Sequence, residues 1–192
     1  MSVEFYNKNA NKFFEETLKA DMNNLYKKFL NNLPVKNGEI LDLGCGSGRD
    51  SRFFKNLGFK ILPIDLSEEL VKKASEYLGQ EVIIQDMRNL NYKDRFIGVW
   101  ACASILHLKI EDIEIVLDKI FESLKKNGIL YASFKYGEED YIKDDRYFTC
   151  FNEERFFKNF PKYKNNCIET FETFDVRKER KNEKWFNIIL KK

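Results

Sequence analysis

The sequence predicts an α/β fold: a single doubly wound domain spanning residues 1–192, with a seven-stranded, mostly parallel sheet and a C-terminal antiparallel β-hairpin. Three observations predict it. Short apolar runs alternate with segments of helical periodicity between residues 39 and 134, as in sheets that helices cover on both faces. A glycine-rich turn follows the first of these runs. Two strand-like stretches joined by a charged turn end the chain, which favours a hairpin.

The first 34 residues are predicted to be helical. The apolar residues of 22–33 fall on one helical stripe, and Pro34 follows the last of them. Aromatic residues between positions 5 and 14 indicate a shorter helix or arm before that stripe. We therefore expect residues 1–34 to form a helical arm.

The alternating elements follow in order. The predicted strands cover residues 39–43, 59–64, 81–85, 96–102, 129–134, 167–176 and 185–190. The predicted helices cover residues 51–57, 67–78, 113–124 and 152–160. Parallel strands joined through helices imply right-handed crossovers, and the terminal hairpin is expected to add an antiparallel strand at one edge.

The amino-acid composition argues against several classes of function for this protein. The formal net charge is +2, from 33 basic and 31 acidic side chains, which argues against a dedicated nucleic-acid binder. The four cysteines form no C-x-x-C pair, and a single histidine leaves no zinc-like cluster, so we expect no metal site and reduced thiols. No apolar run approaches the ~20 residues that span a bilayer, and no signal-peptide core is present. We expect a soluble, cytoplasmic protein without membrane contact; nothing in the sequence indicates its oligomeric state.

Gly44, Gly46 and Gly48 follow the first predicted strand and precede a helix. Glycines there let the backbone turn sharply and approach a ligand without a Cβ clash, and free amides at a helix start favour an anionic group. Two ligands suit such a loop: a dinucleotide pyrophosphate or an amino-acid carboxylate.

Spacing distinguishes the two ligands. The dinucleotide fingerprint has its third glycine three residues after the second, where this chain has Arg49. Asp42, two residues before Gly44, would repel a pyrophosphate but attract the ammonium of a methionine moiety. The spacing favours a methionine-bearing ligand.

Three acidic positions at successive strand ends extend the pattern. The run from Ile40 to Gly48, Asp65 after the second strand and the pair Asp86-Met87 after the third together resemble class I S-adenosylmethionine-dependent methyltransferases, which have a Rossmann-like fold. The resemblance is narrower to the small tellurite-resistance-like methyltransferases. The segments that carry it are Gly48-Arg49-Asp50-Ser51, Trp100-Ala101-Cys102-Ala103-Ser104 with His107, Phe134-Lys135-Tyr136-Gly137 and Trp185-Phe186-Asn187-Ile188-Ile189-Leu190. One departure is Ile97, where many relatives carry Asp, at the strand end far from the ligand.

The resemblance implies S-adenosylmethionine as cofactor and a role for each matched position. Asp65 would accept from the ribose hydroxyls, with Leu66 against the adenine. Asp86 would accept from the adenine amino group, with Met87 on the ring face. The backbone of the glycine loop would hold the methionine portion, and Ala101 and Cys102 would border the sulfonium. The implied cofactor residues are Tyr6, Asp42, Gly44, Cys45, Gly46, Ser47, Gly48, Asp65, Leu66, Asp86, Met87, Ala101 and Cys102.

The acceptor side is less defined. His107 is either a base or positioning group at the transfer site, or a surface or capping residue. Tyr6 and Phe14 are either core aromatics or part of an arm that folds over the cofactor as a lid. The residues Lys135, Tyr136, Arg146 and Tyr147 either line the acceptor pocket or lie in a solvated loop. Asp21 and Asp175 have no assigned role.

The expected reaction is in-line methyl transfer to an unidentified acceptor, for which the protein mainly aligns the reactants and excludes water. We expect a small-molecule acceptor. Two alternatives stay open: an RNA- or protein-directed methyltransferase, and a non-catalytic module that binds S-adenosylmethionine. The compact chain and its near-neutral charge disfavour a macromolecular substrate.

Overall fold

The computed structural model describes residues 2–177 and 180–192. Its α-helices are α1 (Ser2–Lys8), α2 (Ala10–Leu18), α3 (Asn23–Asn32), α4 (Arg49–Asn56), α5 (Glu68–Leu78), α6 (Ile110–Ser123) and α7 (Glu153–Asn159). Three short 3₁₀ turns are η1 (Met87–Asn89), η2 (Ile105–His107) and η3 (Pro161–Asn166). The strands are β1 (Glu39–Leu43), β2 (Lys60–Asp65), β3 (Ile83–Ile84), β4 (Phe96–Ala101), β5 (Leu124–Tyr136), β6 (Tyr141–Lys143), β7 (Arg146–Phe148), β8 (Cys150–Phe151), β9 (Cys167–Phe174) and β10 (Lys184–Lys191).

The main sheet confirms the predicted fold class. Its strands lie in the order β3-β2-β1-β4-β5-β10-β9, and β8 pairs with β5 as an eighth strand. Strands β1 to β5 run parallel, and β10 is antiparallel to both β5 and β9. The predicted terminal hairpin is therefore present, with its second strand rather than its first beside β5.

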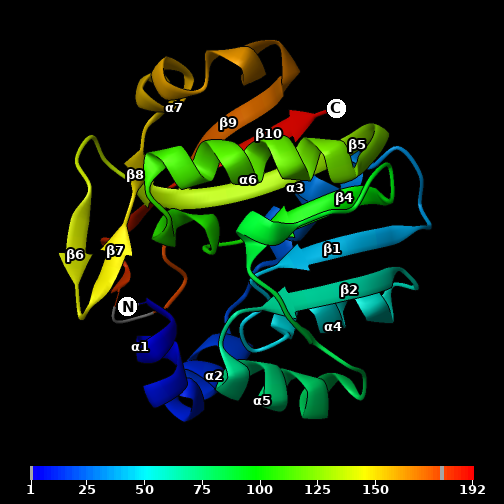
Figure 1. Ribbon diagram of the computed structural model, residues 1–192, viewed down its shortest axis with the longest axis vertical. Helices are drawn as coiled ribbons and strands as arrows, with labels where there is room; N and C mark the ends of the chain where they lie inside the picture. The colour runs from blue at the N-terminus through cyan, green and yellow to red at the C-terminus, as the bar shows by residue number, and fades with distance from the viewer. Residues whose placement is uncertain (1, 178–179) are drawn as a thin grey trace.

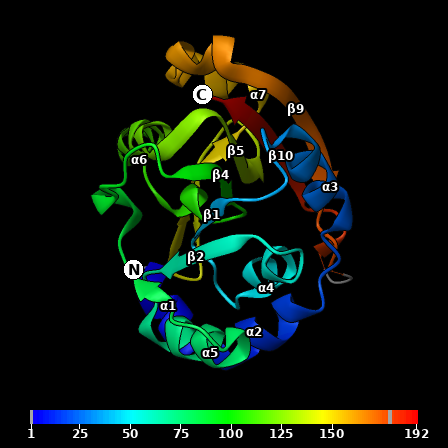
Figure 2. The ribbon, with the colours of Figure 1, turned by 90° about the vertical axis from the view of Figure 1, so that its right-hand side faces the viewer.

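Helices cover both faces of the sheet, with α3 and α4 on one side and α6 on the other (Figure 2). Alternate side chains of each strand supply the two cores. Ile40 packs in the aromatic cluster with Phe29, Phe54 and Trp100, whereas its neighbour Leu41 packs in the cluster below α6. This alternation is what strands buried on both faces require.

Gly98 shows how tightly α3 is seated on the sheet. A Cβ at this position would lie 2.6 Å from Cζ of Phe29 and 2.8 Å from Cδ2 of Leu33. Residues 23–33 are thus a core layer, and only α1 and α2 of the predicted arm lie away from the sheet faces, beside α5 (Figure 1).

Some elements differ from the predictions. The third strand is limited to Ile83–Ile84, and β5 begins at Leu124, directly after α6. The hairpin β6–β7 and the short β8 were not predicted. The turn of the hairpin has Asp144 and Asp145 at φ of 50° and 57°, the conformation of a two-residue turn that matches strand twist. Both α1 and this hairpin lie at the end of the sheet toward which the arrowheads of β1 and β2 point (Figure 1).

Candidate functional site

A large cavity opens at the carboxyl ends of β1, β2 and β4. Its volume is about 1530 Å³, more than the roughly 300–1,000 Å³ of an ordinary ligand pocket. Open α/β sheets bind ligands at this end. The cavity therefore has room for two reactants.

Most of the predicted cofactor residues line this cavity: Tyr6, Gly44, Cys45, Gly46, Ser47, Asp65, Leu66, Asp86, Met87 and Cys102. The lining does not include Asp42, Gly48 or Ala101. Asp42 and Ala101 are buried in strands, and Gly48 is the N-cap of α4. Asp42 lies in β1, which directly precedes the loop, Gly48 ends the loop at the start of α4, and Ala101 ends the neighbouring strand β4.

The glycine loop has the backbone conformation that its sequence requires. Gly44, Gly46 and Gly48 have φ of 76°, 55° and 76°, which L side chains rarely adopt. A Cβ on Gly44 would lie 2.5 Å from Cβ of Ser104, and one on Gly46 would lie 3.1 Å from Cε1 of Phe13. The loop therefore presents bare backbone to the cavity.

Asp65 joins the loop to the next helix. Its Oδ2 accepts from the amide of Gly46 at 2.8 Å, and its Oδ1 accepts from the amide of Ser67 at 2.9 Å. Burial raises the pKa of Asp65, while these two amide bonds oppose the rise. Each carboxylate oxygen keeps a further lone pair for a ligand hydroxyl.

Asp86 and Met87 stand at the far side of the same cavity. Asp86 forms an ion pair with Arg88, with Nη2 at 2.6 Å from Oδ2, and the hydrogen bond from Arg88 lowers the pKa of Asp86. Arg88 also lies 3.4 Å from Asp112. The structure thus places a second ionised carboxylate two strands away from the glycine loop.

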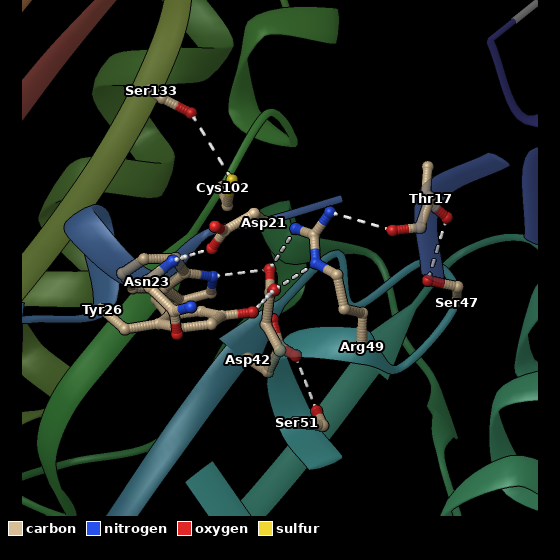
Figure 3. A network of polar contacts seen from close by, with 12 residues as sticks. Thr17, Asp21, Asn23, Tyr26, Asp42, Ser47, Arg49, Ser51, Cys102 and Ser133 are labelled. Atoms are coloured by element: carbon tan, nitrogen blue, oxygen red, sulfur yellow. Dashed lines mark hydrogen bonds and ion pairs between the residues drawn. The ribbon is translucent and has the colours of Figure 1, made fainter. Parts of the chain in front are cut away.

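Behind the loop lies a network centred on Arg49 and Asp50 (Figure 3). Asp50 accepts from Nε and Nη2 of Arg49, from the Tyr26 hydroxyl at 2.5 Å and from the Trp100 indole at 2.8 Å. Burial alone would raise the pKa of Asp50, but the Arg49 guanidinium holds it below its usual value. Arg49 also donates to the carbonyl of Thr17, which ties α2 to the loop.

Asp42 differs from Asp50 in the direction of its pKa shift. It accepts from Ser51 Oγ at 2.6 Å, and burial together with the neighbouring Asp50 raises the pKa of Asp42. The expected attraction between Asp42 and an ammonium remains a prediction. Asp50, whose pKa is lowered, lines the cavity, whereas Asp42 does not.

The end of β4 is strained. Ala103 has a φ of 54°, which is uncommon for a residue with a Cβ, and its amide donates to Ser133 Oγ at 2.8 Å. The next residue, Ser104, has a buried hydroxyl without a hydrogen-bond partner among the described residues. Both line the cavity, next to Cys102. Burial raises the pKa of the Cys102 thiol to about 12, so the thiol is not a nucleophile at neutral pH.

His107 is in the cavity wall and not on the surface. Its Nδ1 lies 2.8 Å from the carbonyl oxygen of Tyr147, and its Nε2 lies 2.8 Å from the hydroxyl of Tyr6. Because a carbonyl can only accept, we assign the ring proton to Nδ1, and Nε2 then accepts from Tyr6. Burial lowers the pKa of His107 to about 4, so the ring is neutral at pH 7.

Three segments remote in sequence meet around His107. Tyr6 comes from α1, Tyr147 from β7 and His107 from η2 after β4. Their spacing along the chain gives no indication that they meet. One signal was available for the hairpin: two Asp residues between Tyr141-Ile142-Lys143 and Arg146-Tyr147-Phe148 suit a two-residue turn.

The structure also locates the candidate residues to which the sequence assigned no definite role. Lys135, Arg146, Tyr147, Asp21 and Asp175 all line the cavity. Tyr136 lies outside the lining and is exposed, and Phe14 packs against Tyr77 of α5, also outside the lining. In residues 2–177 and 180–192, no group of three or more His, Cys, Asp or Glu side chains is arranged to hold a metal ion. No helix within the same ranges is long and apolar enough to cross a bilayer.

Comparisons with known proteins agree with the geometry. Residues 40–128 match a family model described as a methyltransferase domain. A putative methyltransferase, YqeM of Bacillus subtilis, is 37% identical over 117 residues, which cover 55% of this chain and 47% of YqeM. The chain thus spans about half the length of this curated relative.

Two solved structures share the fold. One is the 1,6-didemethyltoxoflavin-N1-methyltransferase of Burkholderia thailandensis, with bound 1,6-didemethyltoxoflavin and S-adenosylhomocysteine, at a TM-score of 0.78 and 17% identity over 100% of this chain and 85% of that one. The other is TehB of Haemophilus influenzae, at a TM-score of 0.73 and 16% identity over 94% of this chain and 65% of that one. The comparisons agree with the resemblance seen in the sequence: residues 40–128 match a methyltransferase-domain model, and both solved structures share the Rossmann-like fold of this chain.

Proposed function

We propose that this protein transfers a methyl group from S-adenosylmethionine to a small-molecule acceptor. One observation carries the proposal: the Asp65 carboxylate lies in the cavity directly beside the bare backbone of the glycine loop, bonded to the Gly46 amide at 2.8 Å. Together they can bind the two parts of a nucleoside–amino-acid ligand. The carboxylate can accept from ribose hydroxyls, and the loop amides can bind the amino-acid group.

The residues present fit this cofactor. Gly44 and Gly46 lack the Cβ that would clash with Ser104 and Phe13, so the loop can keep its shape at the cavity wall. Asp65 suits the ribose, Asp86 and Met87 suit the adenine, and the Arg49 guanidinium, which also lines the cavity, suits a carboxylate. When bound, S-adenosylmethionine supplies an already activated methyl group on its sulfonium, so no metal or covalent intermediate is required. We call these residues and the glycine loop the donor half of the cavity.

The other end of the cavity is formed by α1, η2 and the hairpin β6–β7, and we call it the acceptor half. The Tyr6–His107–Tyr147 hydrogen-bond chain lies there, and the arm supplies Tyr6. A recess bordered by the arm and the hairpin supports a small acceptor rather than an RNA or protein chain. Helices α1 and α2 then serve as the lid expected from the sequence, and Thr17 of α2 donates to Ser47 of the loop at 3.0 Å.

His107 and Tyr6 handle the proton when the acceptor has one to lose. The acceptor gives its proton to the Tyr6 hydroxyl oxygen, and Tyr6 gives its own proton to Nε2 of His107. The Tyr147 carbonyl holds Nδ1–H throughout and so stabilises the imidazolium that forms. Tyr6 thus acts on the acceptor side rather than on the cofactor. The free thiols of all four cysteines support the expected cytoplasmic location.

The test is direct. The purified chain is titrated with S-adenosylhomocysteine by calorimetry, then incubated with methyl-labelled S-adenosylmethionine and a panel of small oxygen, nitrogen and sulfur acceptors. We expect binding, and label transfer with equimolar release of S-adenosylhomocysteine for at least one acceptor. Asp65→Asn should weaken both binding and transfer.

Two outcomes would contradict the proposal. Absence of S-adenosylhomocysteine binding would remove the cofactor site. Binding without transfer to any panel member or to any component of a cell extract would leave a cofactor-binding module without enzymatic activity.

A further inference from the structure

Arg146 is a buried cation with an unused hydrogen-bond donor. It begins β7, lines the acceptor half of the cavity and is 8% exposed. Its Nε has no hydrogen-bond partner among the described residues. A buried donor on a charged group is costly to leave unpaired, so such a group is normally matched by an acceptor.

Aromatic side chains hold the guanidinium in place. Its Cζ lies 3.9 Å from the ring centroid of Phe5, 5.2 Å from that of Phe148 and 5.9 Å from that of Tyr6. Contacts of this kind fix the plane of the guanidinium through its faces. Arg146 also forms a side-chain hydrogen bond with the Tyr6 hydroxyl, while its Nε remains free to meet a ligand.

The ion pair that Arg146 makes is weak and local. Its Nη2 lies 3.2 Å from Oδ2 of Asp144, whose side chain is 57% exposed in the adjacent turn. Solvent screens the exposed Asp144 carboxylate, which weakens its attraction for Arg146. Nη2 and the free Nε form the side-on edge of the guanidinium, which binds two oxygens of a carboxylate or phosphate at once. An incoming oxyanion can displace Asp144 and also engage Nε.

A second cation lies on the same side of the cavity. Lys135 of β5 is 7% exposed, and its Nζ lies 3.8 Å from the ring centroid of Trp185 and pairs with Glu183. The positive charges of Arg146 and Lys135 both act to lower the pKa of His107, which places the two cations around the proposed proton path.

The acidic groups nearby are already matched or exposed. Asp175 pairs with Arg177 at 2.5 Å, and Asp140 pairs with Arg155 and accepts from the Tyr147 hydroxyl. Neither carboxylate neutralises Arg146. The acceptor half thus offers a positive, ring-lined recess next to Tyr6 and His107.

We infer that the methyl acceptor carries an oxyanionic group, which Arg146 binds through its Nε–Nη2 edge while the atom to be methylated faces Tyr6. This inference rests on the proposed function and narrows its substrate class. The anionic group is an anchor, distinct from the group that gives its proton to Tyr6.

The first experiment measures anion binding to the complex with S-adenosylhomocysteine. Benzoate, inorganic phosphate and the neutral benzamide are titrated by calorimetry into wild type, Arg146→Gln, Arg146→Lys and Arg95→Gln. Arg95 is a matched control, because it is also stacked over aromatic rings and paired with a carboxylate, Glu39, but lies before β4 at the opposite end of the sheet. Benzoate and phosphate distinguish a carboxylate from a phosphate anchor.

We expect benzoate or phosphate to bind wild type and Arg95→Gln, and benzamide to bind neither measurably. Arg146→Gln should weaken anion binding about 10- to 100-fold, the range of a charged hydrogen bond, and Arg146→Lys should fall between because it keeps charge but loses the side-on edge. No anion binding to wild type, or equal binding to Arg146→Gln, overturns the inference. Unchanged melting temperatures verify that the variants are folded.

The second experiment separates this inference from the proposed function. In the methyl-transfer panel, carboxylic acids are paired with their carboxamides, and affinity for S-adenosylhomocysteine is measured on the same preparations. Turnover that prefers the acids by tenfold or more in wild type, with the preference lost in Arg146→Gln, supports the inference. Turnover without preference overturns it but leaves the proposed function intact. A loss of S-adenosylhomocysteine affinity in Arg146→Gln also overturns it, since Arg146 would then hold the carboxylate of the cofactor.

Discussion

The donor half and the acceptor half of the cavity are built in different ways. In the donor half, neighbouring strand ends supply Asp65 and the glycine loop, and the ligand-facing carboxylate is already bonded to local amides. In the acceptor half, α1, η2 and β7 bring together side chains more than 100 residues apart, and Arg146 Nε is left unpaired. The difference indicates that the fold itself prepares one reactant site, whereas the other depends on segments appended to the fold.

The largest expected effect tests whether the donor half depends on bare backbone. Gly46→Val adds a Cβ at a φ of 55° and 3.1 Å from Phe13, so strain and overpacking of ~1–3 kcal/mol each should displace the loop. Affinity for S-adenosylhomocysteine, measured by calorimetry, should fall about 1,000-fold.

Gly79→Val is the matched control for that substitution. Gly79 has a φ of 59°, with nothing within 4 Å of a Cβ. It should lower the melting temperature through backbone strain and leave affinity unchanged. Equal affinity losses in both variants would mean that general destabilisation, and not the loop, causes the effect.

The next effect concerns the acceptor half. Tyr6→Phe removes the hydroxyl that donates to His107, and His107→Gln removes the base; each should lower the turnover number about 100-fold for a proton-bearing acceptor. Affinity for S-adenosylhomocysteine should stay within about twofold. The control is Tyr163→Phe, which removes a hydroxyl bonded to Asp118 outside the cavity. A loss of cofactor affinity without a loss of turnover would assign Tyr6 to the donor half instead.

A smaller effect tests which part of the cofactor Asp65 contacts in the donor half. Asp65→Asn keeps the shape of the side chain and removes its charge, so affinity for S-adenosylhomocysteine should fall about 30-fold, as for a lost charged hydrogen bond. Adenosine binding should fall by the same factor, and methionine binding should not change. If methionine binding falls instead, Asp65 contacts the amino-acid part and the two ends of the ligand are reversed.

The smallest effect tests whether the acceptor half is closed before any ligand binds. The folded His107 has a pKa of about 4 against about 6.5 when unfolded, so below pH 6.5 protons bind the unfolded chain and favour it. From pH 8 to pH 5.5, His107 should remove about 1 kcal/mol from the free energy of unfolding. Chemical denaturation of wild type and His107→Gln at both pH values measures the difference. Equal pH dependence would mean that His107 is hydrated and the arm open.

The sequence predicted the donor half better than the acceptor half for a physical reason. The glycine positions, Asp65 and Asp86 follow strands whose order the α/β pattern already implies, so spacing along the chain translates into proximity. The charge of Asp42 was not predictable in this way, because its pKa depends on burial beside Asp50. Arg49 entered the sequence interpretation as the absence of a third glycine and as part of the resembling segment Gly48-Arg49-Asp50-Ser51, and neither use indicated that it pairs with Asp50 and borders the cavity.

The acceptor half could not be predicted from the sequence, because its contacts join residues that are far apart along the chain. Nothing in the spacing relates Tyr6 to His107, and the two open interpretations of His107 depended on that contact. The hairpin β6–β7 is only six paired residues long, and its strands were interpreted as loop. The strand predicted over residues 81–85 is only two residues long in the structure, because it lies at the edge of the sheet and has a partner on one side only.

The hairpin β6–β7 forms a two-stranded sheet of its own, apart from the main one. Its removal or replacement would therefore break no hydrogen bond of the central sheet. Selectivity that resides in such a detachable unit can diverge between relatives, or be redesigned in the laboratory by grafting a different turn, while the machinery that delivers the methyl group stays untouched.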